Sequence, residues 1–132
     1  MGAKPQDMEA RAASAIVIGE TDQAAFSLDQ PARWRRAFSR AGIRDVRSES
    51  DEPPAEGTTL LVRADLILEE VLTKALAVSP DTLLYVERGA MKRPVAVHLP
   101  AARAAEGARL IAAAELPAEM PPDLLMVNPV GL

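Results

Sequence analysis

The loop after the first apolar run is the stretch of this sequence that says most about chemistry. The run Ala15–Gly19 predicts a β-strand, and a helix is expected to begin near Pro31. At such a junction, nucleotide-binding α/β domains place a glycine-rich, basic loop, because only bare backbone N–H groups can approach a phosphate closely. Residues 20–29 contain no glycine, lysine or arginine and carry three acids. The loop therefore predicts that the chain does not bind nucleotide phosphates tightly.

Asp65 and His98 are single residues that could carry catalytic chemistry. Asp65 follows a predicted central strand, at the edge where open α/β sheets bind ligands, and could hold one Mg²⁺ through water. Hard cations normally recruit a second carboxylate or substrate phosphates as well. We therefore favour a loop aspartate that bonds backbone N–H groups near Leu68. His98, the only histidine, could act as a general base, but we favour a structural role within its strand.

Basic side chains gather on the first predicted helix and in one predicted turn. On the helix they form a cationic flank of Arg33, Arg35, Arg36 and Arg40. This flank could contact phospholipid headgroups if the chain is held at a membrane, but we favour a solvated face beside an inward apolar stripe that contains Trp34 and Phe38. In the turn, Lys92 and Arg93 could contact a phosphate or serve solubility, and the sequence leaves both interpretations open.

Apolar periodicity places these residues on alternating strands and helices. Strands are expected over residues 14–19, 44–48, 58–63, 82–86 and 94–98. Helices are expected over residues 31–42, 68–78 and 101–114. The apolar run 58–63 predicts a central strand covered on both faces, and the last two strands predict a hairpin with its turn at 87–93. The order predicts a three-layer α/β fold, with a mostly parallel sheet of about five strands and helices on both faces.

Composition predicts one compact domain with an aliphatic core. The chain has 132 residues, of which 48% are hydrophobic but only 3% aromatic. Its net charge of −4 argues against a nucleic-acid partner, which would need a clustered basic surface. The absence of cysteine excludes a disulfide framework and fits a reducing, cytoplasmic setting.

Three regions are expected along the chain. Residues 1–13 mix charged and small side chains and predict a flexible tail, whereas residues 14–114 predict the α/β domain. Residues 115–132 predict a strap or linker without any regular element, because prolines interrupt it repeatedly. These prolines are Pro117, Pro121, Pro122 and Pro129.

Parts of the chain resemble a known family. The segments 31–46 and 60–68 look like the first half of a sugar-nucleotidyltransferase domain. More narrowly, Arg63-Ala64-Asp65, Arg93–Pro100 and Val127–Pro129 are similar to the degenerate nucleotidyltransferase-like region found N-terminal to some bacterial CDP-alcohol phosphatidyltransferases. The resemblance covers about residues 14–132. The family's G-x-G-x-R activation loop is missing, Ala64 stands in place of a glycine, and the phosphatidyltransferase signature D-G-x-x-A-R is nowhere in the chain.

The resemblance implies a truncated nucleotidyltransferase-like, Rossmann-like domain that belongs to a larger membrane enzyme. It implies a cytoplasmic location at the inner face of the membrane. Its expected partner is the membrane-embedded transferase domain of the same parent protein, and a second copy of the chain is a further option. It also gives Asp65 the place of the aspartate that holds the catalytic magnesium in nucleotidyltransferases.

Two functions are therefore open. In the first, the chain is a non-catalytic accessory domain of a CDP-alcohol phosphatidyltransferase in phospholipid synthesis, and it needs no cofactor. In the second, it is a minimal metal-dependent nucleotidyltransferase or nucleotide-binding enzyme, in which Asp65 and Mg²⁺ neutralise phosphate charge. We favour the first, because such catalysis depends on preorganised donors around the phosphates, and residues 20–29 do not offer them.

Overall fold

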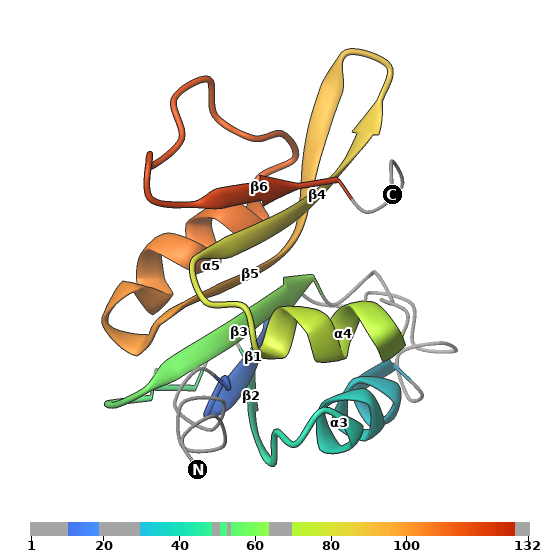
Figure 1. The fold of residues 1–132 in the computed structure, drawn as a ribbon, viewed down its shortest axis with the longest axis vertical. Coiled ribbons are helices and arrows are strands. Elements are labelled where there is room, and N and C mark those ends of the chain that lie inside the picture. The colour runs from blue at the N-terminus through green and yellow to red at the C-terminus, as the bar shows by residue number, and fades with distance from the viewer. Residues whose placement is uncertain (1–10, 19–29, 49–50, 53, 64–69, 129–132) are drawn as a thin grey trace, which may run out of the picture.

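The computed structural model describes residues 11–18, 30–48, 51–52, 54–63 and 70–128. Its strands and helices follow one another in the order that the apolar periodicity predicts, with a 3₁₀ helix and a C-terminal strand in addition (Figure 1). In chain order they are β1 (Ser14–Ile18), α3 (Gln30–Arg40), β2 (Asp45–Ser48), β3 (Thr58–Arg63), α4 (Glu70–Ala77), β4 (Thr82–Arg88), β5 (Met91–Pro100), the 3₁₀ helix η1 (Ala101–Arg103), α5 (Ala104–Ala112) and β6 (Leu125–Val127).

The strands form one open sheet in the order β2-β1-β3-β5-β4-β6. β1 pairs in parallel with both β2 and β3, and β4 pairs in parallel with β6. β5 is antiparallel to β3 and β4, so it alone runs against the other strands. The predicted mixed α/β class and mostly parallel sheet are confirmed, but the sheet has six strands instead of about five.

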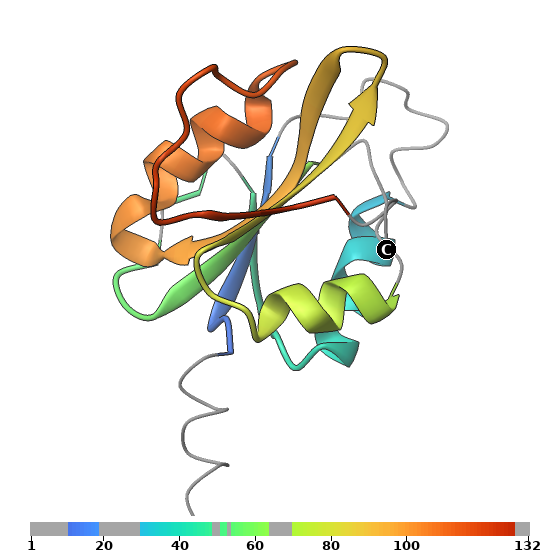
Figure 2. The same ribbon diagram turned by 45° about the horizontal axis from the view of Figure 1, so that its top comes forward.

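Two apolar clusters cover the two faces of this sheet. Leu60 and Val62 of β3 pack on one face with residues of α3 and α4, whereas Leu61 between them packs on the other face with residues of α5. Figures 1 and 2 show the corresponding arrangement, with α3 and α4 on one side of the sheet and α5 on the other. The continuous apolar run of β3 follows from this double coverage.

The end of α3 at glycine is as the sequence predicts. α3 ends at Arg40, and Gly42 follows with φ 89, a left-handed conformation that glycine adopts without steric cost. The Gly42 N–H donates to the carbonyl of Ser39 at 3.0 Å, which closes the last turn. The predicted N-cap, Asp29, lies outside the described residues.

The β4–β5 hairpin is longer than predicted. Its strands continue to Arg88 and from Met91, so the turn comprises only Gly89 and Ala90, and the expected turn over 87–93 is wrong in length. Gly89 has φ 62, which a two-residue hairpin turn favours. Nearer the sheet, Leu84 pairs with Ala96 and Tyr85 with Pro94. The residue between these β5 positions, Val95, is therefore extra and forms a bulge, which accommodates proline within the strand.

The C-terminal segment corrects the prediction that no regular element follows residue 115. Leu125–Val127 forms β6, which pairs with Thr82–Leu84 of β4. Leu116 and Leu124 are both buried against the sheet. Pro117, Pro121 and Pro122 lie before β6 and therefore do not interrupt this short strand.

The folded region also begins before the first strand. The N–H of Ala12 donates to the carbonyl of Ala77 at 2.7 Å, and the N–H of Ala13 donates to the carbonyl of Thr58 at 2.8 Å. Ala12 is itself buried in the core. The rest of the expected tail, residues 1–10, lies outside the described part of the chain.

Candidate functional site

The strand order reverses at β1, because β2 lies on one side of it and β3 on the other. In open α/β sheets, ligands bind outside the carboxyl ends of the strands at such a reversal. Here that point lies beyond Ile18 of β1 and Arg63 of β3. The chain that continues from these two ends, residues 19–29 and 64–69, lies outside the described residues. The predictions for the acidic loop 20–29 and for Asp65 therefore stay predictions.

Arg63, the last residue of β3, forms hydrogen bonds with the C-terminal end of α5. Its Nη1 donates to the carbonyl oxygens of Ile111, at 3.4 Å, and of Ala113, at 3.2 Å. Carbonyls at the end of a helix lack partners within the helix and carry partial negative charge, so a guanidinium stabilises them. This contact joins the centre of the sheet to its α5 layer, a role that the sequence alone does not indicate for Arg63.

His98 has both ring nitrogens engaged inside the protein. Its side chain is 0% exposed, Nδ1 lies 2.8 Å from the carbonyl oxygen of Leu76, and Nε2 lies 2.7 Å from Oγ1 of Thr58. A carbonyl can only accept, so Nδ1 carries the proton and Nε2 accepts from the Thr58 hydroxyl. Burial lowers the pKa of His98, although its backbone hydrogen bond to Leu76 acts in the other direction. The imidazole is therefore held neutral.

The position of His98 in the sheet also separates it from the strand-order reversal. It pairs with Thr82, the first residue of β4, and its Thr58 partner is the first residue of β3. His98 thus lies at the amino edge of the parallel strands, opposite the edge where α/β sheets bind ligands. These contacts support the structural role expected from the sequence.

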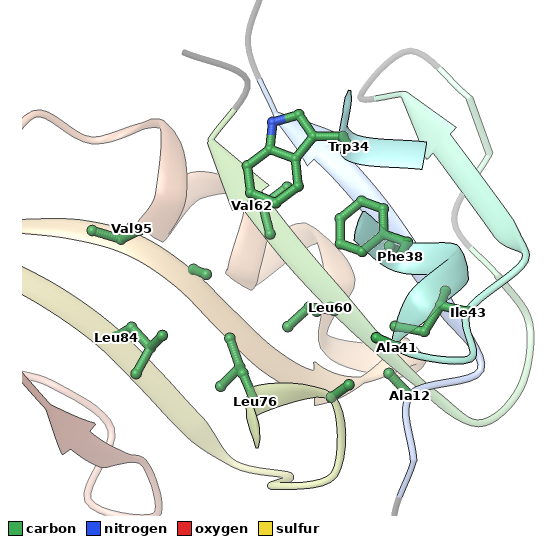
Figure 3. Packing of buried hydrophobic residues seen from close by; sticks show 13 residues of the cluster. Ala12, Trp34, Phe38, Ala41, Ile43, Leu60, Val62, Leu76, Leu84 and Val95 are labelled. Carbon is green, nitrogen blue, oxygen red and sulfur yellow. The ribbon is translucent and has the colours of Figure 1, made fainter. Parts of the chain in front are cut away.

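The buried and exposed faces of α3 are the ones that its sequence predicts. Trp34 and Phe38 are 2% and 0% exposed, and their rings stack with centroids 5.2 Å apart (Figure 3). Arg35, Arg36 and Arg40 are exposed on the rest of the helix, and the side chain of Arg33 lies outside the description. The aromatic pair therefore belongs to the core, as predicted.

Lys92 and Arg93 lie in β5, and the prediction that they belong to a turn is wrong. The Nζ of Lys92 lies over the ring of Tyr85, 5.5 Å from its centroid. Lys92 and Tyr85 both line a pocket between the β4–β5 hairpin and the segment 115–120. The sequence alone does not indicate this pocket, because its walls come from segments that are far apart along the chain.

Within the residues that the structure describes, no three histidine or acidic side chains lie close enough together to hold a metal ion. None of the helices in the described segments is both long enough and apolar enough to cross a membrane.

Comparisons with models of protein families, with curated proteins and with solved structures found no match.

Proposed function

We propose that this chain is a non-catalytic accessory domain of a CDP-alcohol phosphatidyltransferase. In this function the domain packs beside the membrane-embedded transferase part of its parent protein and positions or stabilises it. The proposal is based on the resemblance of residues 14–132 to that family.

The observation that carries the proposal is that the imidazole of His98 is fully occupied by structural hydrogen bonds. His98 is the one histidine of the chain, and both of its nitrogens bond within the fold at the edge opposite the strand-order reversal. Arg63 is used similarly, because it bonds the last carbonyls of α5. Both polar side chains thus connect helices to the sheet. This is the use expected in a domain whose role is to pack against or position another domain.

The alternative is a minimal metal-dependent nucleotidyltransferase or nucleotide-binding enzyme that uses Asp65. One observation favours it: the strand order reverses between β2 and β3, and Asp65 follows β3 by two residues. In this function Mg²⁺ on Asp65 would neutralise phosphate charge during transfer.

A substitution of Asp65 separates the two functions. Asp65→Asn keeps the size of the side chain and removes its charge, so we expect a change in unfolding free energy of about 1 kcal/mol or less. Pyrophosphate release from CTP, with Mg²⁺ and a phosphorylated alcohol present, should stay at background for both proteins. A Mg²⁺-dependent activity that Asp65→Asn abolishes would favour the enzyme.

The family itself has a direct test in the coding sequence. We expect the reading frame to continue into hydrophobic segments that carry D-G-x-x-A-R. A stop codon directly after Leu132 would contradict membership in a longer phosphatidyltransferase.

A further inference from the structure

The pocket at the β4–β6 end of the sheet has walls from two parts of the chain. The β4–β5 hairpin projects past β6, because β6 pairs only with Thr82–Leu84 while β4 continues to Arg88 (Figure 1). The segment 115–120, which leads from α5 towards β6, lies beside this projecting hairpin (Figure 2). Between them is a pocket of about 330 Å³, within the size range of small-molecule sites.

Several contacts fix the segment that forms the outer wall. The N–H of Leu116 donates to the carbonyl oxygen of Lys92 at 2.8 Å, which ties the segment to β5. Further along, Nη1 of Arg103 donates to Oδ2 of Asp123 at 2.7 Å, while Nη2 of the same guanidinium bonds Glu106 at 2.6 Å. Leu116, which also lines the pocket, and Leu124, which follows the lining part of the segment, are both buried. The pocket is therefore preformed by a wall that is anchored at both ends.

The lining combines an apolar surface with one charge of each sign. Leu116, Met120, Met126 and the ring of Tyr85 supply apolar surface, and Lys92 and Glu115 supply the charges. Methionine side chains are flexible and polarisable, so they adapt to ligands of different outline. Lys92 has no ion pair among the described residues, and its ammonium group instead lies over the Tyr85 ring. That cation–π contact leaves the charge free to attract an anion from solution.

We propose that this pocket binds a small amphipathic organic monoanion. Its apolar body packs against Met120, Met126 and the Tyr85 ring, and its acidic group contacts Lys92. Glu115 repels a second negative charge, so polyanions such as nucleoside phosphates are disfavoured in this pocket. The inference goes beyond the accessory function and does not depend on it.

Two dyes that differ in charge test this proposal on the full chain. 8-Anilinonaphthalene-1-sulfonate is an aromatic monoanion, and N-phenyl-1-naphthylamine is the same ring system without the sulfonate. We expect the anion to bind with saturable fluorescence enhancement to protein that near-ultraviolet circular dichroism shows to be folded. Lys92→Gln should weaken the binding of the anion about fivefold and leave that of the neutral dye unchanged. Arg36→Gln, a matched loss of charge at an exposed position of α3, should change neither.

A substitution in the pocket wall and an NMR spectrum test whether the anion binds in this pocket. Met120→Glu puts a carboxylate into the apolar wall at a half-buried position outside any strand or helix, so we expect it to fold and to lose at least tenfold in affinity for the anion. In a ¹⁵N correlation spectrum of the unmodified chain, the anion should shift the amides of Ala90, Lys92 and Ala118. Shifts confined to other regions would overturn the site. Equal weakening of both dyes by Lys92→Gln, or no weakening, would overturn the ligand class.

Discussion

His98 joins parts of the chain that are distant in sequence. It lies in β5, and its ring bonds the end of α4 through Leu76 and the start of β3 through Thr58. Because the side chain is fully buried and neutral, protonation would force the Thr58 hydroxyl to turn and accept from Nε2, and would place a charge away from water. The residue therefore couples stability to pH.

The first prediction is the sign of that coupling. Burial lowers the pKa of His98 in the folded protein below its ordinary value of about 6.5, so the unfolded chain binds a proton that the folded chain does not. The stabilising contribution is complete above about pH 6.5 and is lost as the pH falls towards the folded-state pKa. Urea unfolding between about pH 7.5 and 5 should show this loss. His98→Gln, which cannot titrate, should be less stable at neutral pH but have a shallower slope. Equal slopes in the two proteins would rule out this role.

Trp34 and Phe38 are the second residue-scale case. Both are buried on α3 and pack towards Leu60 and Val62 of β3 (Figure 3). Truncation of a large buried aromatic side chain costs about 3–5 kcal/mol, a large share of the stability of a domain this size. Trp34→Ala or Phe38→Ala should therefore lower the thermal midpoint sharply or leave the chain insoluble. Arg36→Ala on the same helix should change the unfolding free energy by less than about 0.5 kcal/mol. A Trp34→Ala protein of normal stability that had lost self-association or membrane binding would contradict the core assignment.

At the scale of elements, α5 is held to the sheet by close packing as well as by Arg63. A Cβ added at Gly107 would lie 2.9 Å from Cδ1 of Leu99 and 3.0 Å from Cδ1 of Leu61. Both leucines are fully buried, so they have little space into which to move. Glycine at this position allows the helix to approach β3 and β5.

Overpacking at this contact gives the third prediction. Gly107→Val should lower the unfolding free energy by about 1–3 kcal/mol, because the core between α5 and the sheet must expand. Ala105→Val, at an exposed position of the same helix, is the control and should cost only its helix propensity, about 0.5 kcal/mol. Chemical denaturation measures both. If the two substitutions cost the same, the close approach of α5 does not limit the packing.

The sequence predicts elements well where a single stretch contains the whole signal. β3 has the predicted bounds, because a strand buried on both faces is apolar at every position. β6 was missed, since three residues among prolines become a strand only through pairing with β4. The start of β5 was assigned to a turn for a similar reason: Lys92 and Arg93 are polar, and their place in the strand depends on the opposite arm of the hairpin.

The site residues follow the same rule. A structural role for His98 could be predicted from its type and place, but its partners Leu76 and Thr58 could not, because the fold alone brings them together. The pocket near Lys92 was missed because the sequence does not show that the segment 115–120 lies beside the hairpin.

At the scale of the whole molecule, several structural contacts among the described residues lie at the amino edge of the parallel strands. There Ala12 bonds the end of α4, Ala13 bonds the start of β3, and His98 bonds both. The opposite edge contains the strand-order reversal, where an α/β domain that binds a nucleotide would hold it. Whether this edge binds nucleotide decides between the accessory domain and the enzyme.

Calorimetric titration of the full chain with CTP in the presence of Mg²⁺ tests this central claim most directly. Residues 20–29 offer no glycine and no basic side chain to a phosphate, so we expect a dissociation constant weaker than about 1 mM. The same titration of Asp65→Asn should give an indistinguishable result. A dissociation constant in the low micromolar range that Asp65→Asn weakens would contradict the accessory function and establish nucleotide binding at this edge.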